Sequence, residues 1–261
     1  MSTFRLLTLN AHSFAHPSIL ENTSSKLASI LCQYDLDLIA VQEIQNDNEW
    51  KQFRKDLSLP HSIYGQCWGD LFGNGIASRH PISFYANELS NEKIRAGRRS
   101  MLQCRLEGNH PFVQNRTFAV THLDHIDEDI RLKQIKQFDP IRHQIDILLG
   151  DMNALTRDDY SDQYYHDEIV AKREESQWEQ PRFDVTKLIT EEWGYEDVYR
   201  LYNPENKDQQ VATCRFQTRI DYIYVHPRVN DEWIVKQCHI IDTQGFTDHQ
   251  AVFTEFELKS Q

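Results

Sequence analysis

Short apolar runs alternate along the chain with segments whose apolar residues recur every three or four positions. The runs predict strands at 4–10, 38–41, 82–87, 100–106, 116–122, 145–149, 220–225, 233–241 and 250–258. Helical spacing predicts helices after the capping residues at 22–25, over 48–57 and over 128–138. Gly73-Asn74-Gly75 predicts a turn before the apolar residues that follow it, and residues 158–200 form a polar, helix-prone region.

The order of these elements favours one domain of the α/β (α+β) class. Helices alternate with strands in the first part of the chain and strands dominate later, which indicates mixed sheets with helices packed outside them. The sequence contains no internal repeat, low-complexity tract or Gly/Ser linker. We therefore expect a single domain over residues 1–261.

Composition excludes a membrane protein and a disordered chain. Hydrophobic residues make up 39% and charged residues 26% of the sequence, which is typical of a globular protein. No apolar run approaches the roughly 18 residues that span a bilayer, and Asn10 and His12 interrupt the N-terminal segment too early for a signal peptide. The five scattered cysteines include no CxxC pair, which favours free thiols over structural zinc. We expect an intracellular protein, cytoplasmic or nuclear, with no membrane partner and no obligate protein partner.

The net charge of −12 bears on the partner. Proteins that bind long duplex DNA without sequence preference usually have a basic surface, because phosphate neutralisation drives that binding. The acidic total disfavours such a nuclease but is compatible with a local basic cleft. The best positive cluster is Lys93, Arg95, Arg98 and Arg99, which is either a solvated loop or a wall that binds substrate phosphates.

Two polar residues end the first expected strands. Asn10 follows an apolar run, where an asparagine is usually a turn or cap residue. Glu43 ends the next apolar run, where it is either a solvated residue or a ligand for a hard cation. Magnesium binds one or two carboxylates and keeps several waters, so Glu43 suits it.

The segment Thr121-His122-Leu123-Asp124-His125 ends another strand and is followed by Arg131 on the next expected helix. Positions 122 and 124 would point to the same side if the strand continued. A lone histidine is more often structural, whereas two histidines and an aspartate within four positions leave a functional site equally open.

Asp151 and Asn153 follow the strand at 145–149, after a glycine that permits a tight exit. An aspartate can take a proton and an asparagine can only hydrogen-bond. This pair suits the orientation of an attacking water beside a phosphate.

The last expected strands bring Asp221 and the dipeptide Asp248-His249. An aspartate bonded to a histidine ring nitrogen fixes the tautomer and favours the imidazolium. We predict that Asp221 does this for His249, and that Asp248 biases the same site or contributes a metal ligand.

The ordered motifs TLN, VQE, THLDH, GDMN, RIDYI and TDH resemble the endonuclease/exonuclease/phosphatase superfamily over about residues 4–258. GDMN and TDH are the most specific, with Thr247 in place of the usual serine. Arg131 and Gln134 extend THLDH toward a subgroup with the pattern NTHLDH…R..Q, in which Val120 replaces the asparagine. The resemblance implies a DNase I-like, four-layer α/β/β/α sandwich of two mixed β-sheets flanked by helices, with the site at one sheet edge.

The same resemblance implies roles for the motif residues. Glu43 would be the principal ligand of Mg²⁺, for which Mn²⁺ could substitute, with Asn10 beside it and Asp248 as a further ligand. The catalytic group would comprise Asp151, which activates or orients the water, together with Asn153, His122, Asp124, His249 and Asp221. In it Asn153 and His122 would hold phosphate oxygens and His249 would stabilise the transition state; whether His249 or Asp151 is the base stays open.

The expected activity is metal-dependent hydrolysis of a phosphodiester, most consistent with a nuclease or an enzyme that processes short or single-stranded nucleic-acid ends. Arg99, Arg131 and Arg215 are expected to bind substrate, and aromatic residues of the 156–200 region such as Trp178 could stack an unpaired base. Two alternatives stay open. One is hydrolysis of a small inositol phosphate or nucleotide, and the other is a non-catalytic binding protein on the same fold.

Overall fold

The computed structural model describes residues 2–68, 72–92, 97–229 and 231–259. Its strands form two six-stranded sheets, of order β11-β12-β1-β2-β4-β3 and β5-β6-β7-β8-β10-β9. The first sheet comprises β1 (Thr3–Asn10), β2 (Leu38–Ile44), β3 (His61–Trp68), β4 (Phe72–Ser78), β11 (Trp233–Ile241) and β12 (Ala251–Leu258). The second comprises β5 (Ile82–Leu89), β6 (Ser100–Leu106), β7 (Thr117–His122), β8 (Ile147–Asp151), β9 (Glu196–Asp197) and β10 (Asp221–Val225).

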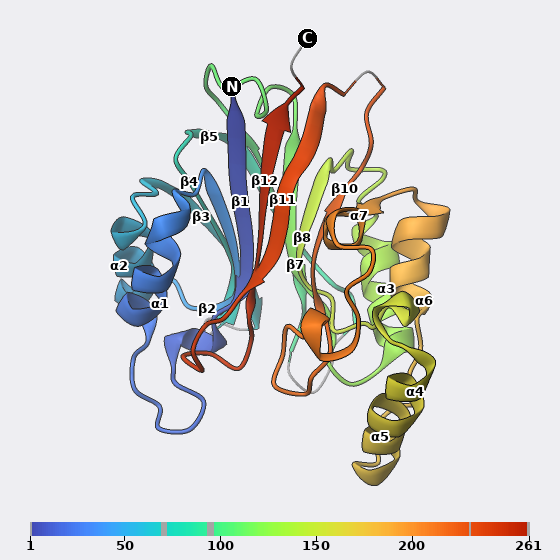
Figure 1. Ribbon diagram of the computed structural model, residues 1–261. Coiled ribbons are helices and arrows are strands. Elements are labelled where there is room, and N and C mark those ends of the chain that lie inside the picture. Colours follow the sequence, from blue (N-terminus) through green and yellow to red (C-terminus); the bar gives the residue numbers. More distant parts are fainter. Residues whose placement is uncertain (1, 69–71, 93–96, 230, 260–261) are drawn as a thin grey trace.

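Helices cover the outer face of each sheet (Figure 1). The α-helices are α1 (Ser24–Leu31), α2 (Asn48–Asp56), α3 (Glu128–Phe138), α4 (Asp162–Tyr164), α5 (Ala171–Glu175), α6 (Asp184–Lys187) and α7 (Val198–Tyr202). Short 3-10 turns lie at His12–Phe14, Cys32–Tyr34, Arg157–Asp159 and Asp208–Val211, and π turns at Tyr165–Val170 and Leu188–Glu192. The predicted four-layer sandwich is confirmed. Within the described residues no helix has the length and apolar character needed to cross a bilayer.

Strand alternation builds the layers. Successive side chains of a strand point to opposite faces, so Phe4 and Leu6 of β1 pack between the two sheets while Leu7 and Leu9 pack under α1 and α2. In the second sheet, Leu148 of β8 packs under α3 and α6, and its neighbours face the other sheet. Each central strand is therefore buried on both faces, which explains its continuous apolar sequence.

Each sheet contains one parallel pair, and these two pairs position the site. β1 pairs with β2 and β7 pairs with β8, and in each case a helix makes the crossover. Parallel strands end at the same edge of a sheet, which places Asn10 opposite Gln42 and His122 opposite Asp151 in register. Both chain termini lie at the other end of the sandwich, and β1 runs away from them (Figure 1). Four polar strand ends thus meet at one end of the molecule.

Three expectations need correction. Gly73-Asn74-Gly75 lies inside β4 and not in a turn. A Cβ on Gly73 would lie 2.2 Å from the Gly65 carbonyl oxygen, so these glycines serve close packing within the sheet. β3, whose sequence HSIYGQCW contains no continuous apolar run, is a strand that the sequence pattern does not predict. β7 ends at His122, so Asp124 lies in the following loop and does not continue the strand. The predicted phosphate-wall residues Lys93 and Arg95 lie outside the described residues, and a single domain over 1–261 stays a prediction.

Candidate active site

Glu43 reaches the site because β2 is irregular there. The pairing of β2 with β4 shifts register between Val41 and Ile44, and Glu43 has a left-handed backbone with φ 55°. This conformation costs a non-glycine residue about 1–2 kcal/mol. Val41 and Ile44 both pack into the apolar layer under α1 and α2. The bulge therefore turns Glu43 away from that layer and toward the end of β1.

Asn10 joins the two halves of the site. Its side-chain amide nitrogen donates to Glu43 Oε1 at 3.2 Å and to Asp151 Oδ2 at 3.1 Å. Its amide oxygen accepts from the backbone N–H of His12 at 3.1 Å, which fixes which way the amide faces. Asn10 is thus the link between an acid of the first sheet and an acid of the second.

Asp151 ends β8 at a point where only glycine fits before it. Gly150 has φ 132°, and a Cβ on it would lie 2.0 Å from the Thr121 carbonyl oxygen of β7. The resulting close approach of the strands places Asp151 Oδ2 3.5 Å from His122 Nε2. The backbone N–H of Asn153 donates to Asp151 Oδ1 at 2.9 Å, so one carboxylate oxygen is held and the other faces the site.

The predicted Asp221–His249 contact is present. Asp221 lies directly opposite Asp151 in the antiparallel pairing of β10 with β8, and its Oδ2 is 2.8 Å from His249 Nδ1. His249 Nε2 is 3.8 Å from Asp151 Oδ2. All three side chains are buried, so His249 lies between two carboxylates that water screens poorly.

Burial and charge shift the pKa of each of these groups. Burial raises the pKa of Asp151, and the charge of Asp221 raises it further, to about 7. Burial alone would lower the pKa of His249, but the charge and hydrogen bond of Asp221 raise it well above its usual value. For Glu43, burial opposes ionisation, but the contacts with His12, His122 and Asn10 outweigh it and leave the pKa below its usual range.

The loop with Asp248 and His249 is fastened to the end of β1. Thr247 Oγ1 donates to the Asn10 carbonyl oxygen at 2.8 Å, so threonine supplies the hydroxyl that serine has in the motif that TDH resembles. The segment at 213–215 pairs with this loop: the Arg215 N–H donates to the Asp248 carbonyl oxygen, and Cys214 forms an antiparallel bridge with His249. The position of His249 is therefore set by backbone pairing as well as by Asp221.

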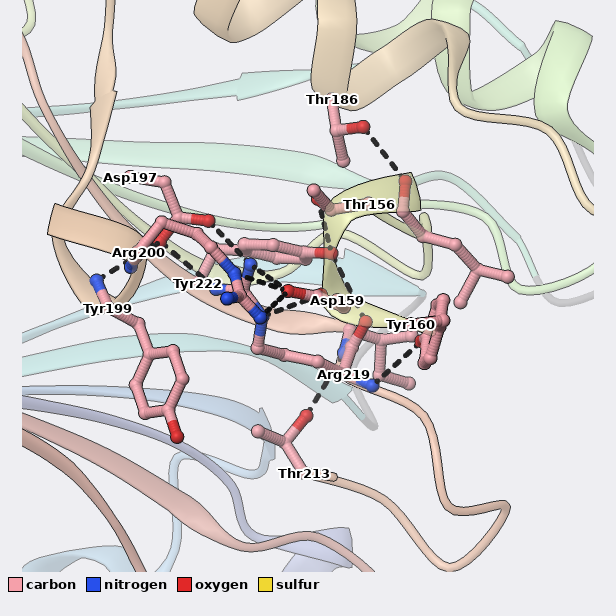
Figure 2. Close-up of polar contacts among 12 residues, drawn as sticks. Thr156, Asp159, Tyr160, Thr186, Asp197, Tyr199, Arg200, Thr213, Arg219 and Tyr222 are labelled. Atoms are coloured by element: carbon pink, nitrogen blue, oxygen red, sulfur yellow. Dashed lines mark hydrogen bonds and ion pairs between the residues drawn. The ribbon is translucent and has the colours of Figure 1, made fainter. Parts of the chain in front are cut away.

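A buried ion-pair network fixes the start of β10, where Asp221 lies (Figure 2). Arg219 donates to both oxygens of Asp159 at 2.8 and 2.9 Å and to both oxygens of Asp197 at 3.0 and 2.6 Å. The Thr213 hydroxyl oxygen accepts from the backbone N–H groups of Ile220 and Asp221. The network ties the loop before α4, the start of α7 and β10 into one unit.

Asp124 and Arg131 do not join the cluster. Asp124 Oδ2 accepts from two backbone N–H groups of its own loop. The guanidinium of Arg131 donates to Glu128, to Glu179 and to the Asp124 carbonyl oxygen, so its side chain is engaged by the protein even though it lines the cavity. Their placement indicates that they brace the loop after β7.

His12 lies in the site although its sequence position gave only a weak signal, two residues after Asn10. Its Nδ1 is 3.4 Å from Asp248 Oδ1 and 3.7 Å from Glu43 Oε2. The hydrogen bond with Glu43 raises the pKa of His12. His12 begins a run of three non-glycine residues with positive φ, a strained turn of the kind that occurs at functional sites.

Two groups of side chains could hold a metal ion. One is the buried set Asp151, Asp221 and His249, whose ligand atoms lie within 4.8 Å of one another. The other is Glu43 with Asp248, whose carboxylates offer hard oxygen donors. The predicted ligand Asn10 turns its amide nitrogen toward Glu43 and its amide oxygen toward the His12 N–H. In the first group, His249 Nδ1 and Asp221 Oδ2 are hydrogen-bonded to each other at 2.8 Å, so neither atom is available to a metal ion. In the second, Glu43 favours its ionised form, and its neighbours lie 3.2–3.9 Å away. The oxygen donors of the second group fit a hard cation.

A cavity of about 700 Å³ opens onto these residues. Among the described residues, six Lys or Arg and five Asp or Glu line it, whereas the whole chain has 28 basic and 40 acidic residues. Arg99 and Arg215 are both in its lining. Trp178 and Phe216 also line it, with ring centroids 4.8 Å apart and edge-to-face, and they are 41% and 44% exposed. The cavity is richer in cations than the chain and has an uncovered aromatic pair at its wall.

The sequence was compared with families, curated proteins and solved structures. The profile of the Endonuclease/Exonuclease/phosphatase family matches residues 7–249. No curated protein matches the sequence.

Three similar solved structures share the fold. An endonuclease/exonuclease/phosphatase from Beutenbergia cavernae has a TM-score of 0.73 at 17% identity, over 100% of this chain and 72% of that one. The human Nocturnin catalytic domain with bound sulfate has a TM-score of 0.68 at 16% identity, over 98% and 95%. ANGEL2, a 2′,3′-cyclic phosphatase in complex with adenosine-2′,3′-vanadate, has a TM-score of 0.67 at 16% identity, over 99% and 96%.

Proposed function

Because the chain belongs to the Endonuclease/Exonuclease/phosphatase family, we propose that it is a phosphodiesterase that depends on Mg²⁺, with Mn²⁺ able to substitute. That it is a phosphoesterase of this family follows from the match; the bond type, the metal and the substrate are the proposal. The observation that carries it is the convergence of Glu43, Asp151 and His249 at one cavity, with Asn10 bonded to both acids, although the four residues come from four separate segments.

Glu43 and Asp248 would hold the cation, and Asn10, whose amide nitrogen donates to Glu43, would orient the Glu43 carboxylate. Glu43 is the natural principal ligand, since its carboxylate favours the ionised form and lies in the cavity lining. His12 bridges Glu43 and Asp248 in the present geometry. A bound divalent cation polarises the phosphate and neutralises charge on the leaving oxygen.

Asp151 would orient the attacking water and accept its proton while the water oxygen bonds to phosphorus and the ester P–O bond breaks. Two contacts favour Asp151 over His249 as the base. Asp151 Oδ1 is held by the Asn153 N–H, which leaves Oδ2 toward the cavity. His249 donates from Nδ1 to Asp221 and favours the protonated form, so it has no free lone pair to accept a proton.

His249, His122 and Asn153 would stabilise the phosphate. Donors arranged in advance around developing negative charge are commonly the largest contribution to such catalysis. His249, charged and held by Asp221, suits the phosphorane-like transition state. Asn153 and His122 suit the non-bridging oxygens, because both line the cavity beside Asp151.

We propose a short or single-stranded nucleic-acid end as substrate. The Trp178–Phe216 pair is exposed inside the cavity, and Arg215 lies over the Phe216 ring at 4.8 Å, which together suit an unpaired base and its phosphate. Arg99 adds a cation to the same lining. A small nucleotide or inositol phosphate would use the same centre, but it would make fewer contacts with the aromatic pair. A non-catalytic binding role would not require the buried acids and histidines of the site.

The first test asks whether the protein hydrolyses a phosphodiester or a phosphomonoester. The purified chain is assayed with bis-p-nitrophenyl phosphate and p-nitrophenyl phosphate, after EDTA treatment and then with Mg²⁺ or Mn²⁺ restored. We expect metal-dependent turnover that favours the diester and is lost in Asp151→Asn. Asp158→Asn, an exposed aspartate outside the cavity lining, is the matched control and keeps full turnover. Preference for the monoester would replace the phosphodiesterase assignment with a phosphatase.

The substrate is tested next, on labelled single-stranded, duplex and 5′-adducted oligonucleotides. We expect Trp178→Ala and Phe216→Ala to raise KM for single-stranded ends while leaving turnover of bis-p-nitrophenyl phosphate unchanged. Tyr85→Ala removes an aromatic residue that is 59% exposed but outside the cavity, and serves as control. Far higher activity on duplex plasmid than on oligonucleotide ends would refute the substrate assignment.

A further inference from the structure

Arg99 contacts two histidines and, within the described part of the chain, forms no ion pair with a carboxylate. Its Nη1 lies 3.1 Å from His122 Nδ1, and its Nη2 lies 3.4 Å from His125 Nδ1. Its Nε–H is buried, and no acceptor for it lies among the described residues. A guanidinium that is half-buried and bonded to imidazoles in place of acids is unusual, because cations so placed are normally paired.

The donor and acceptor properties of these groups decide where the protons lie. A guanidinium has only N–H donors and no acceptor, and it stays charged. Each Nδ1 must therefore accept from Arg99, which leaves the proton of each neutral ring on Nε2. An imidazolium carries a proton on both ring nitrogens and has no lone pair to offer, so accepting from Arg99 also requires each ring to be neutral.

One neighbour competes for His122. Glu43 Oε1 is 3.9 Å from the same Nδ1, and a carboxylate there would favour a proton on that nitrogen. Arg99 Nη1 is closer, at 3.1 Å, and a proton on Nδ1 would set two N–H groups against each other. The contact with Arg99 prevails, and His122 Nε2–H then faces Asp151 Oδ2 at 3.5 Å.

We propose that Arg99 is a positioning residue that fixes His122 and His125 as neutral Nε2–H tautomers. Both histidines line the cavity, so the tautomer decides that Nε2, and not Nδ1, is the ring nitrogen that carries a proton there. Lysine would not replace arginine here, because one ammonium cannot span two rings as the planar guanidinium does. The catalytic meaning of this arrangement rests on the proposed function, whereas the tautomers themselves do not.

The tautomers are measured by ¹⁵N NMR of the full chain labelled in its histidine rings, without substrate. His122→Gln and His125→Gln assign the signals. In the wild type we expect Nδ1 to be unprotonated and Nε2 protonated in both rings. Arg99→Met should convert the two rings to mixtures of tautomers. Arg98→Met, which removes the adjacent arginine, should leave them unchanged. Arg99→Lys should release at least one ring and covers the case in which Arg99→Met does not fold.

Activity supplies the second readout. We expect Arg99→Met to lower kcat on bis-p-nitrophenyl phosphate about 10- to 100-fold, by analogy with the loss seen when a group that orients a metal-binding histidine is removed. A proton on Nδ1 of His122 in the wild type, or unchanged tautomers in both Arg99 variants, would overturn the proposal. If the wild type hydrolyses no phosphoester but shows the expected tautomers, the proposed function fails and the assignment of Arg99 stands.

Discussion

Replacing Arg219 by methionine tests how the ion-pair network supports the site. The guanidinium is 1% exposed and is shared by Asp159 and Asp197. Its removal leaves two carboxylates in a region where water cannot take over the lost hydrogen bonds. Arg219 also lies over the Tyr222 ring at 4.4 Å, a packing contact that methionine keeps only in part.

The magnitude follows from what each carboxylate keeps. Breaking a buried ion pair by removing one partner costs about 3–5 kcal/mol. Asp159 retains Arg200, whose Nη2 is 2.6 Å away, and Asp197 retains two backbone N–H groups at the start of α7. Both residual contacts favour the lower end of that range, about 3 kcal/mol. At about 2–4 °C per kcal/mol for a chain of this size, the melting temperature falls by about 6–12 °C.

Arg182→Met is the matched control. Arg182 also donates to two aspartates, Asp184 at 2.9 Å and Asp129 at 2.7 Å, but all three side chains are exposed to solvent. Exposed pairs contribute about 0–1 kcal/mol, so this variant should melt close to the wild type. Thermal and urea unfolding, both followed by circular dichroism, compare the wild type, Arg219→Met and Arg182→Met.

A second variant separates charge from shape. In Arg219→Met combined with Asp197→Asn, one uncompensated charge is removed, so part of the lost stability should return. If Arg219→Met costs less than about 1 kcal/mol, or no more than Arg182→Met, the reasoning from burial is refuted. The same variant should lower turnover, because Asp221 follows Arg219 by two residues in the segment that the network holds.

Three further predictions follow from the site and the sheets. Asp151→Asn, His249→Ala and Glu43→Ala should each lose at least about 10²-fold in kcat on a phosphodiester; wild-type turnover in all three folded variants would refute the site. Gly150→Ala should cost more than about 1 kcal/mol in urea unfolding, because the added Cβ meets backbone at 2.0 Å and the φ of 132° is strained. Burial opposes ionisation of Glu255, but Arg5 and Lys236 lower its pKa below the unfolded 4.5. The ionised Glu255 side chain should therefore stabilise the fold fully above pH 4.5, and this stabilisation should be lost as the pH falls through the lowered pKa of the folded state. The free energy of unfolding of the wild type minus that of Glu255→Gln is measured from pH 7 to pH 3, and a constant difference would refute this.

Most elements are recognisable in the sequence from their apolar residues. Central strands are buried on both faces and form continuous apolar runs, whereas helices are buried on one side and show apolar residues every three or four positions. The strand at 100–106 and the helix at 128–138 match β6 and α3 at both ends. β3 gives no strand signal in the sequence because its apolar residues form no continuous run and do not alternate regularly with polar ones. Gly73 and Gly75 were assigned to a turn because glycine's conformational freedom and its lack of a Cβ cannot be told apart in a sequence. At both positions the structure uses the missing Cβ.

The site was less accessible to sequence, since its contacts join distant segments. The predicted Asp221–His249 contact follows from the general chemistry of such pairs, and the geometry agrees at 2.8 Å. Nothing local indicates that Arg131 is occupied by Glu179, 48 residues away. His12 is recognisable only when Glu43 and Asp248 are seen on either side of it.

The distribution of charge connects the site with its proposed substrate. A net charge of −12 repels a long polyanion, and repulsion among exposed charges decays over about 10 Å at 0.1 M ionic strength. Within the cavity the balance reverses, since six basic residues face five acids there and three of those acids, Glu43, Asp151 and Asp248, belong to the proposed centre. With a divalent cation bound, two further positive charges would offset most of what those acids contribute. Such a field admits one phosphate with its neighbouring nucleotide and disfavours a duplex laid along the surface, which is the physical reason to expect an end and not a backbone as the substrate.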